Sequence, residues 1–185
     1  MMKIVAVVPI KLNNRRLPQK NTRCFSNGKP LCYYIFSTLQ KIHEIDEIYV
    51  YCSNEKIKAF LPSGIQFLAR SRSFDRDETS MNEVLLGFAE EITADIYVMA
   101  HTTAPFIQAE SIQRGLEAVL SKEYDSAFSA KKVQDFLWSG QKPLNYNLDH
   151  IPRTQDLETI YQETSGFYIY TENVIREMGR RIGDK

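Results

Sequence analysis

Short apolar runs alternate along this chain with segments in which apolar residues recur at helical spacing. The runs at residues 3–8, 47–52 and 96–100, with a shorter one at 64–68, are almost entirely apolar, as expected of strands buried on both faces. Helical spacing is found between them and after them. The helical segments are 31–42, 81–88 and 112–120. This alternation predicts an α/β fold, in which a mostly parallel sheet carries helices on both faces.

Composition narrows the classes of function. The 185 residues are 43% hydrophobic without a composition break, which predicts a single domain over residues 1–185. Lysine plus arginine equals aspartate plus glutamate at 23 each, so no overall field favours nucleic acid or an anionic membrane. No run approaches the roughly 20 apolar residues of a membrane span. Three cysteines without a CxxC pair, and no secretory signal, favour buried thiols in a reducing cytoplasm.

Polar segments follow three of the predicted strands. They are the long segment 9–30, the charged segment 70–80 and the short segment 101–105. Ligands of wound α/β sheets bind outside the carboxyl ends of the strands, so we expect these segments to share one crevice. Ser80 and Glu83 form a predicted capping box for the helix that follows the second segment. From about residue 124 two strand-like runs, 126–131 and 166–170, indicate additions to the wound core.

The loop at residues 11–21 is the strongest candidate for an anion site. Its four cations are Lys11, Arg15, Arg16 and Lys20. They match the charge of a triphosphate, although the loop contains neither a G-x-G-x-x-G nor a G-x-x-x-x-G-K-[ST] motif. Asn13 and Asn14 tolerate left-handed backbone, which would let successive amides point inward as an anion nest. The alternative is a solvated basic loop.

The other candidates also have simpler interpretations. Arg70 and the mixed charges after it are compatible with a solvated turn before a capped helix, and His101 with a core histidine. No spacing indicates a zinc site, and neither a Gly-x-Ser-x-Gly elbow nor a Cys/His nucleophile pair is present. Hydrolysis through a covalent intermediate is therefore disfavoured.

Taken in order, these segments resemble the acylneuraminate cytidylyltransferases, which make CMP-sialic acid and related CMP-activated sugars from CTP. Residues 10–21 are similar to the family's A-R-G-G-S-K-G-[IL]-P-x-K-N loop, and 28–31 to its G-x-P-L. Residues 101–105 (HTTAP) stand where the family has Q-[PA]-T-S-P. Residues 152–156 (PRTQD) resemble P-R-R-Q-D, and 161–168 (YQETSGFY) resemble Y-x-E-N-G-x-[FI]-Y. The common order and spacing make the combination specific.

The resemblance implies a fold, a reaction and a set of site residues. The fold would be the three-layer wound, mostly parallel sheet of the nucleotide-diphospho-sugar transferase type. A hydroxyl of a sialic-acid-like keto sugar acid would attack the α-phosphorus of CTP, with Mg²⁺ as cofactor and metal ligands unknown. Arg153 and Lys20 would be catalytic, and Gln155 and Tyr168 would bind the sugar. The nucleotide-binding set would be Lys11, Asn13, Asn14, Arg15, Asn21, Arg70, Ser80, His101 and Thr103. A homodimer would form through an extension at 131–157.

Several positions depart from the family pattern. Lys11 replaces an arginine and so lacks its planar fork, while Leu12, Asn13 and Arg16 replace glycines. His101 replaces a glutamine, and residues 164–165 (TS) replace Asn-Gly. The chain also stops before the family's late D-x-D segment, so we expect the C-terminal end to be missing. These departures leave two alternatives open, namely a different nucleotide or acceptor, or a degenerate domain that binds a nucleotide without turnover.

Overall fold

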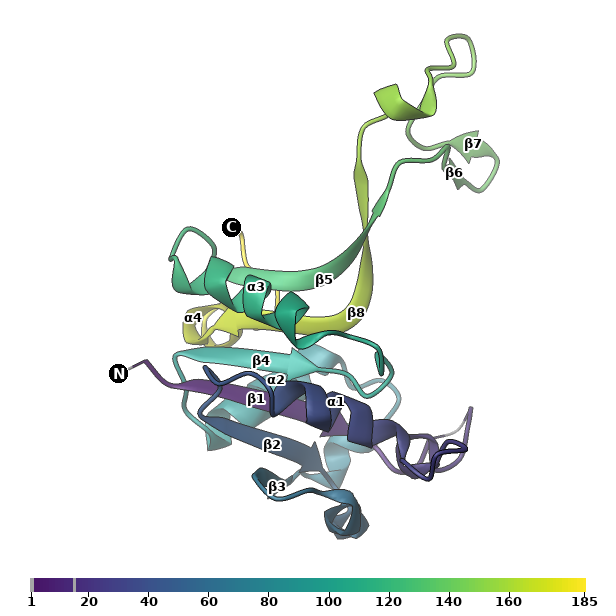
Figure 1. Cartoon of the computed structure of the whole chain (residues 1–185). Coiled ribbons are helices and arrows are strands. Elements are labelled where there is room, and N and C mark those ends of the chain that lie inside the picture. Colours follow the sequence, from purple (N-terminus) through teal and green to yellow (C-terminus); the bar gives the residue numbers. More distant parts are fainter. Residues whose placement is uncertain (1, 15) are drawn as a thin grey trace. The chain divides into compact units, whose positions relative to one another are not determined.

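A six-stranded sheet forms the centre of the computed structural model, which describes residues 2–14 and 16–185 (Figure 1). The strands lie in the order β3-β2-β1-β4-β8-β5. They are β1 (Ile4–Ile10), β2 (Glu47–Cys52), β3 (Ile65–Ala69), β4 (Ile96–Ala100), β5 (Ser126–Val133) and β8 (Ile160–Thr171). β1 pairs in parallel with β2 and β4, and β2 pairs in parallel with β3, whereas β8 runs antiparallel to β4. The sheet is therefore mostly parallel, as predicted.

Helices pack on both faces of this sheet (Figure 1). They are α1 (Leu31–Leu39), α2 (Met81–Glu91), α3 (Ala109–Leu120) and α4 (Glu172–Arg176), with 3-10 turns η1 (Lys20–Thr22), η2 (Glu55–Phe60) and η3 (Arg72–Asp75). Because side chains alternate along a strand, Ala6 and Val8 pack into one core with α1 and α3, and Val5 and Val7 pack into another with α2 and α4. The predicted α/β class with three layers is confirmed. Within the described ranges, none of these helices has the length and apolar character needed to cross a membrane.

The ends of the elements show which sequence signals are local. Ser80 caps α2 as predicted, because its hydroxyl accepts from the Glu83 amide at 3.2 Å and its amide donates to the Glu83 carboxylate at 2.7 Å. Helix α1 ends at Leu39. The apolar pattern continues to Ile42 because that residue, although beyond the helix, is buried in the same core. Strand β8 is longer than the predicted run at 166–170. Its first half was not predicted because it is largely exposed and carries no apolar pattern.

Strand register brings the carboxyl ends of the parallel strands to one edge of the sheet. Ile10 of β1 pairs with Cys52 of β2, which pairs with Ala69 of β3, and Val7 pairs with Met99 of β4. The segments after β1, β3 and β4 all leave from this edge, as predicted. The candidate loops are therefore neighbours because of the topology of the sheet.

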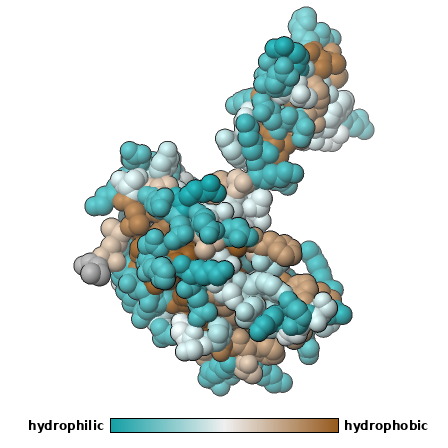
Figure 2. Space-filling model, in the orientation of Figure 1, coloured by the Kyte–Doolittle hydropathy of each residue, from teal (hydrophilic) through white to brown (hydrophobic). Residues whose placement is uncertain are grey.

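Residues 129–164 form a second compact unit, and the predicted extension at 131–157 lies inside it. The unit contains the antiparallel pair β6 (Trp138–Ser139) and β7 (Lys142–Pro143) and the 3-10 turn η4 (Thr154–Asp156). The side-chain amide of Asn145 joins the segments that flank this pair, because it accepts from the backbone of Leu137 and donates to that of Asp135. Apolar side chains are exposed on this unit (Figure 2), the large ones being Phe136, Trp138, Leu144, Leu148, Ile151 and Tyr161.

Candidate functional site

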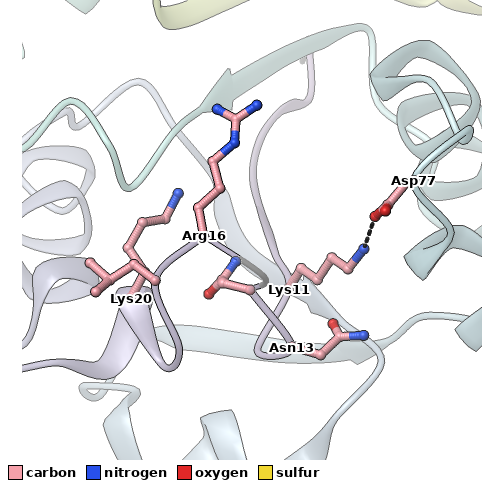
Figure 3. Close-up of a pocket in the computed structure, with 7 residues that line it drawn as sticks. Lys11, Asn13, Arg16, Lys20 and Asp77 are labelled. Atoms are coloured by element: carbon pink, nitrogen blue, oxygen red, sulfur yellow. Dashed lines mark hydrogen bonds and ion pairs between the residues drawn. The ribbon is translucent and has the colours of Figure 1, made fainter.

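The loop after β1 encloses a pocket of about 510 Å³ at the carboxyl edge of the sheet (Figure 3). It is lined by Lys11, Asn13, Asn14, Arg16, Leu17, Lys20 and Asp77. Three cations and one carboxylate therefore surround a space that is large enough for a polyphosphate. Arg15, the fourth predicted cation of the loop, lies outside the described residues. The clustering of basic side chains around one pocket favours an anion site over a merely solvated loop.

Asn21 anchors the far end of this loop. The side chain is buried, donates from Nδ2 to the carbonyl of Lys11 at 2.9 Å, and accepts through Oδ1 from the Thr102 hydroxyl at 2.7 Å. The loop is thereby fastened to the segment that follows β4. Asn21 was predicted to line the nucleotide pocket, and the structure shows its amide bonded to Lys11, which lines the pocket, and to Thr102.

The predicted anion nest at Asn13 and Asn14 is wrong in its backbone conformation. Both residues line the pocket, but neither has a positive φ. In the described part of the loop the left-handed residue is Gln19, with φ 56°, directly before η1. The Asn21 side chain joins the end of the loop to Lys11 at its start, so the chain reverses near η1 and needs no left-handed turn at 13–14.

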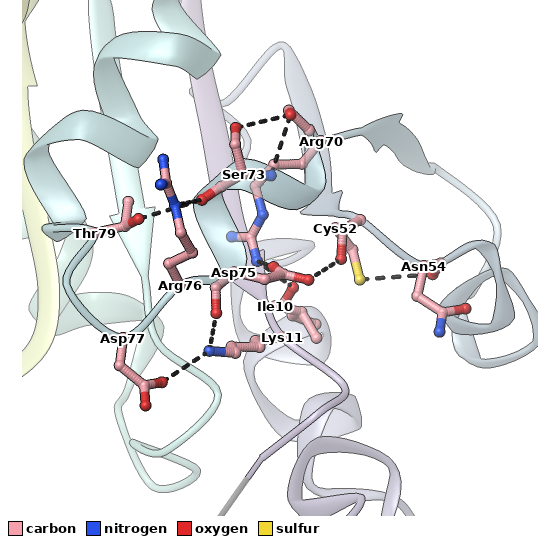
Figure 4. Close-up of polar contacts among 12 residues, drawn as sticks. Ile10, Lys11, Cys52, Asn54, Arg70, Ser73, Asp75, Arg76, Asp77 and Thr79 are labelled. Carbon is pink, nitrogen blue, oxygen red and sulfur yellow. Dashed lines mark hydrogen bonds and ion pairs between the residues drawn. The ribbon is translucent and has the colours of Figure 1, made fainter.

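A buried ion pair between Arg70 and Asp75 lies next to Lys11, which lines the pocket (Figure 4). The Arg70 guanidinium donates to the Asp75 carboxylate at 2.7 Å and to the carbonyl of Ile10 at 3.2 Å, and its side chain is only 4% exposed. Asp75 also accepts from Ser53 after β2, and its backbone carbonyl accepts from the Lys11 ammonium. Arg70 does not line the pocket, so its contact with a nucleotide stays a prediction. Its observed contacts join the ends of three strands.

Lys11 is oriented by this network. Its ammonium contacts the Asp75 carbonyl and lies 3.3 Å from the Asp77 carboxylate, as Figure 4 shows. Asp77 is 44% exposed and faces the pocket. The ion pair with Asp77 holds the Lys11 ammonium at the wall of the pocket. A phosphate group entering there would meet a cation that is already positioned.

His101 follows β4 and lies beside two cations. Its backbone amide donates to the carbonyl of Gly166 at 3.1 Å, and its ring meets the Tyr168 ring edge-on, with centroids 6.5 Å apart. Burial, together with the charges of Arg181 and Lys20, lowers the pKa of His101 to about 4. The imidazole is therefore neutral at pH 7, with a lone pair available as an acceptor.

The remaining predicted residues are placed as follows. Thr103 is exposed in the segment after β4, Ser80 is occupied by the cap of α2, and Tyr168 is fully buried with its hydroxyl donating to Ser165 at 3.3 Å. Arg153 and Gln155 belong to the second unit. There the Arg153 guanidinium forms a bidentate ion pair with the Asp156 carboxylate, with hydrogen bonds of 2.7 and 3.1 Å, and its side chain is largely exposed. Their roles in a site stay predictions.

Three residues at or near the site were not predicted from the sequence as site residues. Asp77 lines the pocket, Thr102 holds Asn21, and Arg181 lies over the Tyr168 ring. Asp77 and Thr102 stand inside segments that were singled out for their position after strands, so a carboxylate or hydroxyl there was a detectable signal. Arg181 had no motif. Only the packing of the tail after α4 brings it to this edge.

A wound sheet with a basic pocket at the carboxyl end of its first strand is typical of proteins that bind phosphate-containing ligands such as nucleotides. The chain belongs to the cytidylyltransferase family, whose model matches residues 5–183. It is 25% identical over 183 residues to the N-acylneuraminate cytidylyltransferase of Oncorhynchus mykiss, covering 93% of this chain and 42% of that protein. It is 23% identical over 184 residues to a pseudaminic acid cytidylyltransferase of Campylobacter jejuni, covering 92% and 79%. The chain thus spans less than half the length of the fish protein.

Solved structures agree with this fold. The chain aligns with CMP:2-keto-3-deoxy-manno-octonic acid synthetase complexed with CTP at a TM-score of 0.72 and 16% identity, covering 95% of this chain and 77% of that one. It aligns with 4-diphosphocytidyl-2C-methyl-D-erythritol synthase of Anaerococcus prevotii at a TM-score of 0.65 and 14% identity, covering 96% and 74%. At these identities the likeness shows the fold.

Proposed function

We propose that this chain transfers the cytidylyl group of CTP to a hydroxyl of a keto sugar acid and releases pyrophosphate. The observation that carries the proposal is the basic pocket after β1, which lies in a chain matched over residues 5–183 by the cytidylyltransferase family. The names of the relatives from Oncorhynchus mykiss and Campylobacter jejuni support a sugar acid as the acceptor. Both names denote transfer to a sugar acid.

Positioning and electrostatics account for this reaction without a covalent intermediate on the protein. The acceptor oxygen forms a bond to the α-phosphorus while the bond from that phosphorus to the bridging oxygen of pyrophosphate breaks, and the proton of the acceptor hydroxyl passes to water. Lys11, Arg16 and Lys20 line the pocket and would bind the triphosphate. Their charges would offset the charge that develops on pyrophosphate as it leaves. Lys20 is the residue to which we assign the catalytic contact.

Magnesium fits this pocket only in company with the nucleotide. Among residues 2–14 and 16–185 no cluster of three or more His, Cys, Asp or Glu side chains forms a protein cage for a metal. Mg²⁺ is commonly held by one or two carboxylates together with substrate phosphates and water. Asp77, the carboxylate at the pocket wall, is suited to that mode. The ion would neutralise phosphate charge when bound.

Pyrophosphate release tests the proposal. The protein is incubated with CTP, Mg²⁺ and, in turn, N-acetylneuraminate, pseudaminate and 2-keto-3-deoxy-manno-octonate, and each product is identified by mass. We expect release with one of these acids and a large loss in Lys20→Ala. Lys41→Ala is the matched control, because Lys41 is exposed in the connection between α1 and β2. Tight CTP binding without release for any acceptor would favour a degenerate binding domain.

A different nucleotide or acceptor is the second candidate. His101 stands where the resembled family has glutamine, and its neutral imidazole offers a different hydrogen-bonding pattern to a ligand. Thermal shifts with CTP, UTP, ATP and GTP at equal concentration separate the candidates, because a ligand that binds the folded state stabilises it more the lower its Kd. Greater stabilisation by a purine nucleotide than by CTP would replace the first proposal with this one.

We also propose that the second unit joins two copies of the chain. Its exposed apolar side chains include Ile151 at 64%, Leu144 at 59% and Trp138 at 53%. Clusters of this kind on a soluble domain mark interaction surfaces. Light scattering should give the mass of a dimer, and Leu144→Glu with Ile151→Glu should give that of a monomer. A monomer for the unaltered chain would contradict this assignment.

A further inference from the structure

The tail after α4 places Arg181 against two elements at the carboxyl edge of the sheet. Its guanidinium carbon lies 4.4 Å from the centre of the Tyr168 ring, and its Nη1 donates to the Asn82 side chain at 3.0 Å. Tyr168 is fully buried in β8, and Asn82 lies in the first turn of α2. Two rigid elements therefore orient this one guanidinium. Its neighbour Arg180 instead pairs within the tail, with Asp184.

His101 connects Arg181 with the nucleotide pocket, because the charge of Arg181 and that of Lys20 in the pocket both act on its imidazole. The imidazole meets the Tyr168 ring edge-on, and the charges of both Arg181 and Lys20 act on it. Lys20 lines the pocket after β1. The two cations therefore lie near the same imidazole, one in the nucleotide loop and one in the tail. An anion beside this imidazole would be attracted by both.

The chemistry of this group suits a carboxylate better than a further phosphate. The loop cations Lys11, Arg16 and Lys20 already surround the pocket that a triphosphate would occupy. The planar fork of a guanidinium matches the two oxygens of a carboxylate, and the Arg181 guanidinium is positioned by the Tyr168 ring and by Asn82. The neutral His101 ring adds a wall that carries no charge of its own at pH 7.

We propose that Arg181, held over the Tyr168 ring, binds the carboxylate of the acceptor and that His101 forms a wall of this subsite. The inference rests on the proposed function, because it assigns the acid group of the acceptor to a particular side chain. Arg181 is then a specificity-determining residue. It selects acidic acceptors and orients their hydroxyl toward the nucleotide bound after β1.

Steady-state kinetics with Arg181→Gln tests the assignment, with Arg180→Gln as the matched control. The unaltered protein is first shown to use a keto sugar acid. Arg181→Gln should then raise the KM for that acid by about 10- to 100-fold, the loss expected for a charged hydrogen bond, and leave the KM for CTP within about twofold. Arg180→Gln should change neither constant. The amide of the same acceptor should be equally poor with the unaltered protein and with Arg181→Gln.

The outcomes separate the two proposals. If no keto sugar acid is used by the unaltered protein, the proposed function fails and this inference with it. If an acid is used and Arg181→Gln leaves its KM unchanged, or raises the KM for CTP equally, only the inference fails. Should Arg181→Gln not fold, Arg181→Lys retains the charge over Tyr168 but loses the fork, and a selective rise in the KM for the acid is expected there too.

Discussion

The buried pair of Arg70 and Asp75 gives the most quantitative test of how the pocket is supported. The two side chains are 4% and 15% exposed, so solvent screens their charges little. Removing one partner of such a pair commonly costs about 3–5 kcal/mol, because the other charge stays buried. In Asp75→Ala, Arg70 keeps the carbonyl of Ile10 as an acceptor. We therefore expect a loss at the lower end, about 3 kcal/mol.

Urea unfolding of a double-mutant cycle measures this coupling. Arg70→Met should cost a similar amount, while the double variant should lose clearly less than the sum, with a coupling energy of about 2 kcal/mol. Glu55→Ala is the control, because Glu55 and Lys58 form an exposed pair, at 74% and 51%, and should contribute under about 0.5 kcal/mol. Additive losses from Arg70→Met and Asp75→Ala, within about 0.5 kcal/mol, would refute the reasoning.

Three further predictions concern single groups. Because the folded pKa of His101 is lowered to about 4 from 6.5, its contribution to stability is present above pH 6.5 and lost as the pH falls toward 4. Between pH 7.5 and 4.5 the unaltered protein should lose about 2–3 kcal/mol of unfolding free energy relative to His101→Gln, and parallel pH profiles of the two proteins would contradict this. Ser80→Ala removes the cap of α2 and should lower the free energy of unfolding by about 1 kcal/mol, measured in urea. Gly87→Ala would put a methyl group 2.7 Å from the Phe74 ring, and calorimetry should show a loss of about 1–3 kcal/mol in the free energy of unfolding.

The sheet and its helices were predictable because their signals are local. An apolar run such as residues 96–100 predicts a buried strand, and the pair of Ser80 and Glu83 predicts a helix cap, each from a few neighbouring residues. The convergence of loops at one edge also followed, since parallel strands end at the same side. The first half of β8 was missed because an exposed antiparallel strand leaves no apolar pattern. The second unit was anticipated only as an extension.

The site was predictable in its location more than in its contacts. The basic loop was found from its charges, but the left-handed residue is Gln19 instead of an asparagine, because tertiary contacts set the turn. The bond between Asn21 and Thr102 joins positions 81 residues apart, and no local pattern encodes it. Arg181 depends on how the tail packs over Tyr168. Contacts of this kind arise from the fold as a whole.

The affinity for CTP tests the central claim most directly. Titration calorimetry should show that the unaltered protein binds CTP and that Lys20→Met binds it about 10- to 100-fold more weakly, the loss expected for a charged contact with phosphate. Lys41→Met, altered at an exposed position between α1 and β2, should bind as the unaltered protein does. Equal CTP affinity in Lys20→Met and the unaltered protein would contradict the assignment of the pocket after β1 as the triphosphate site.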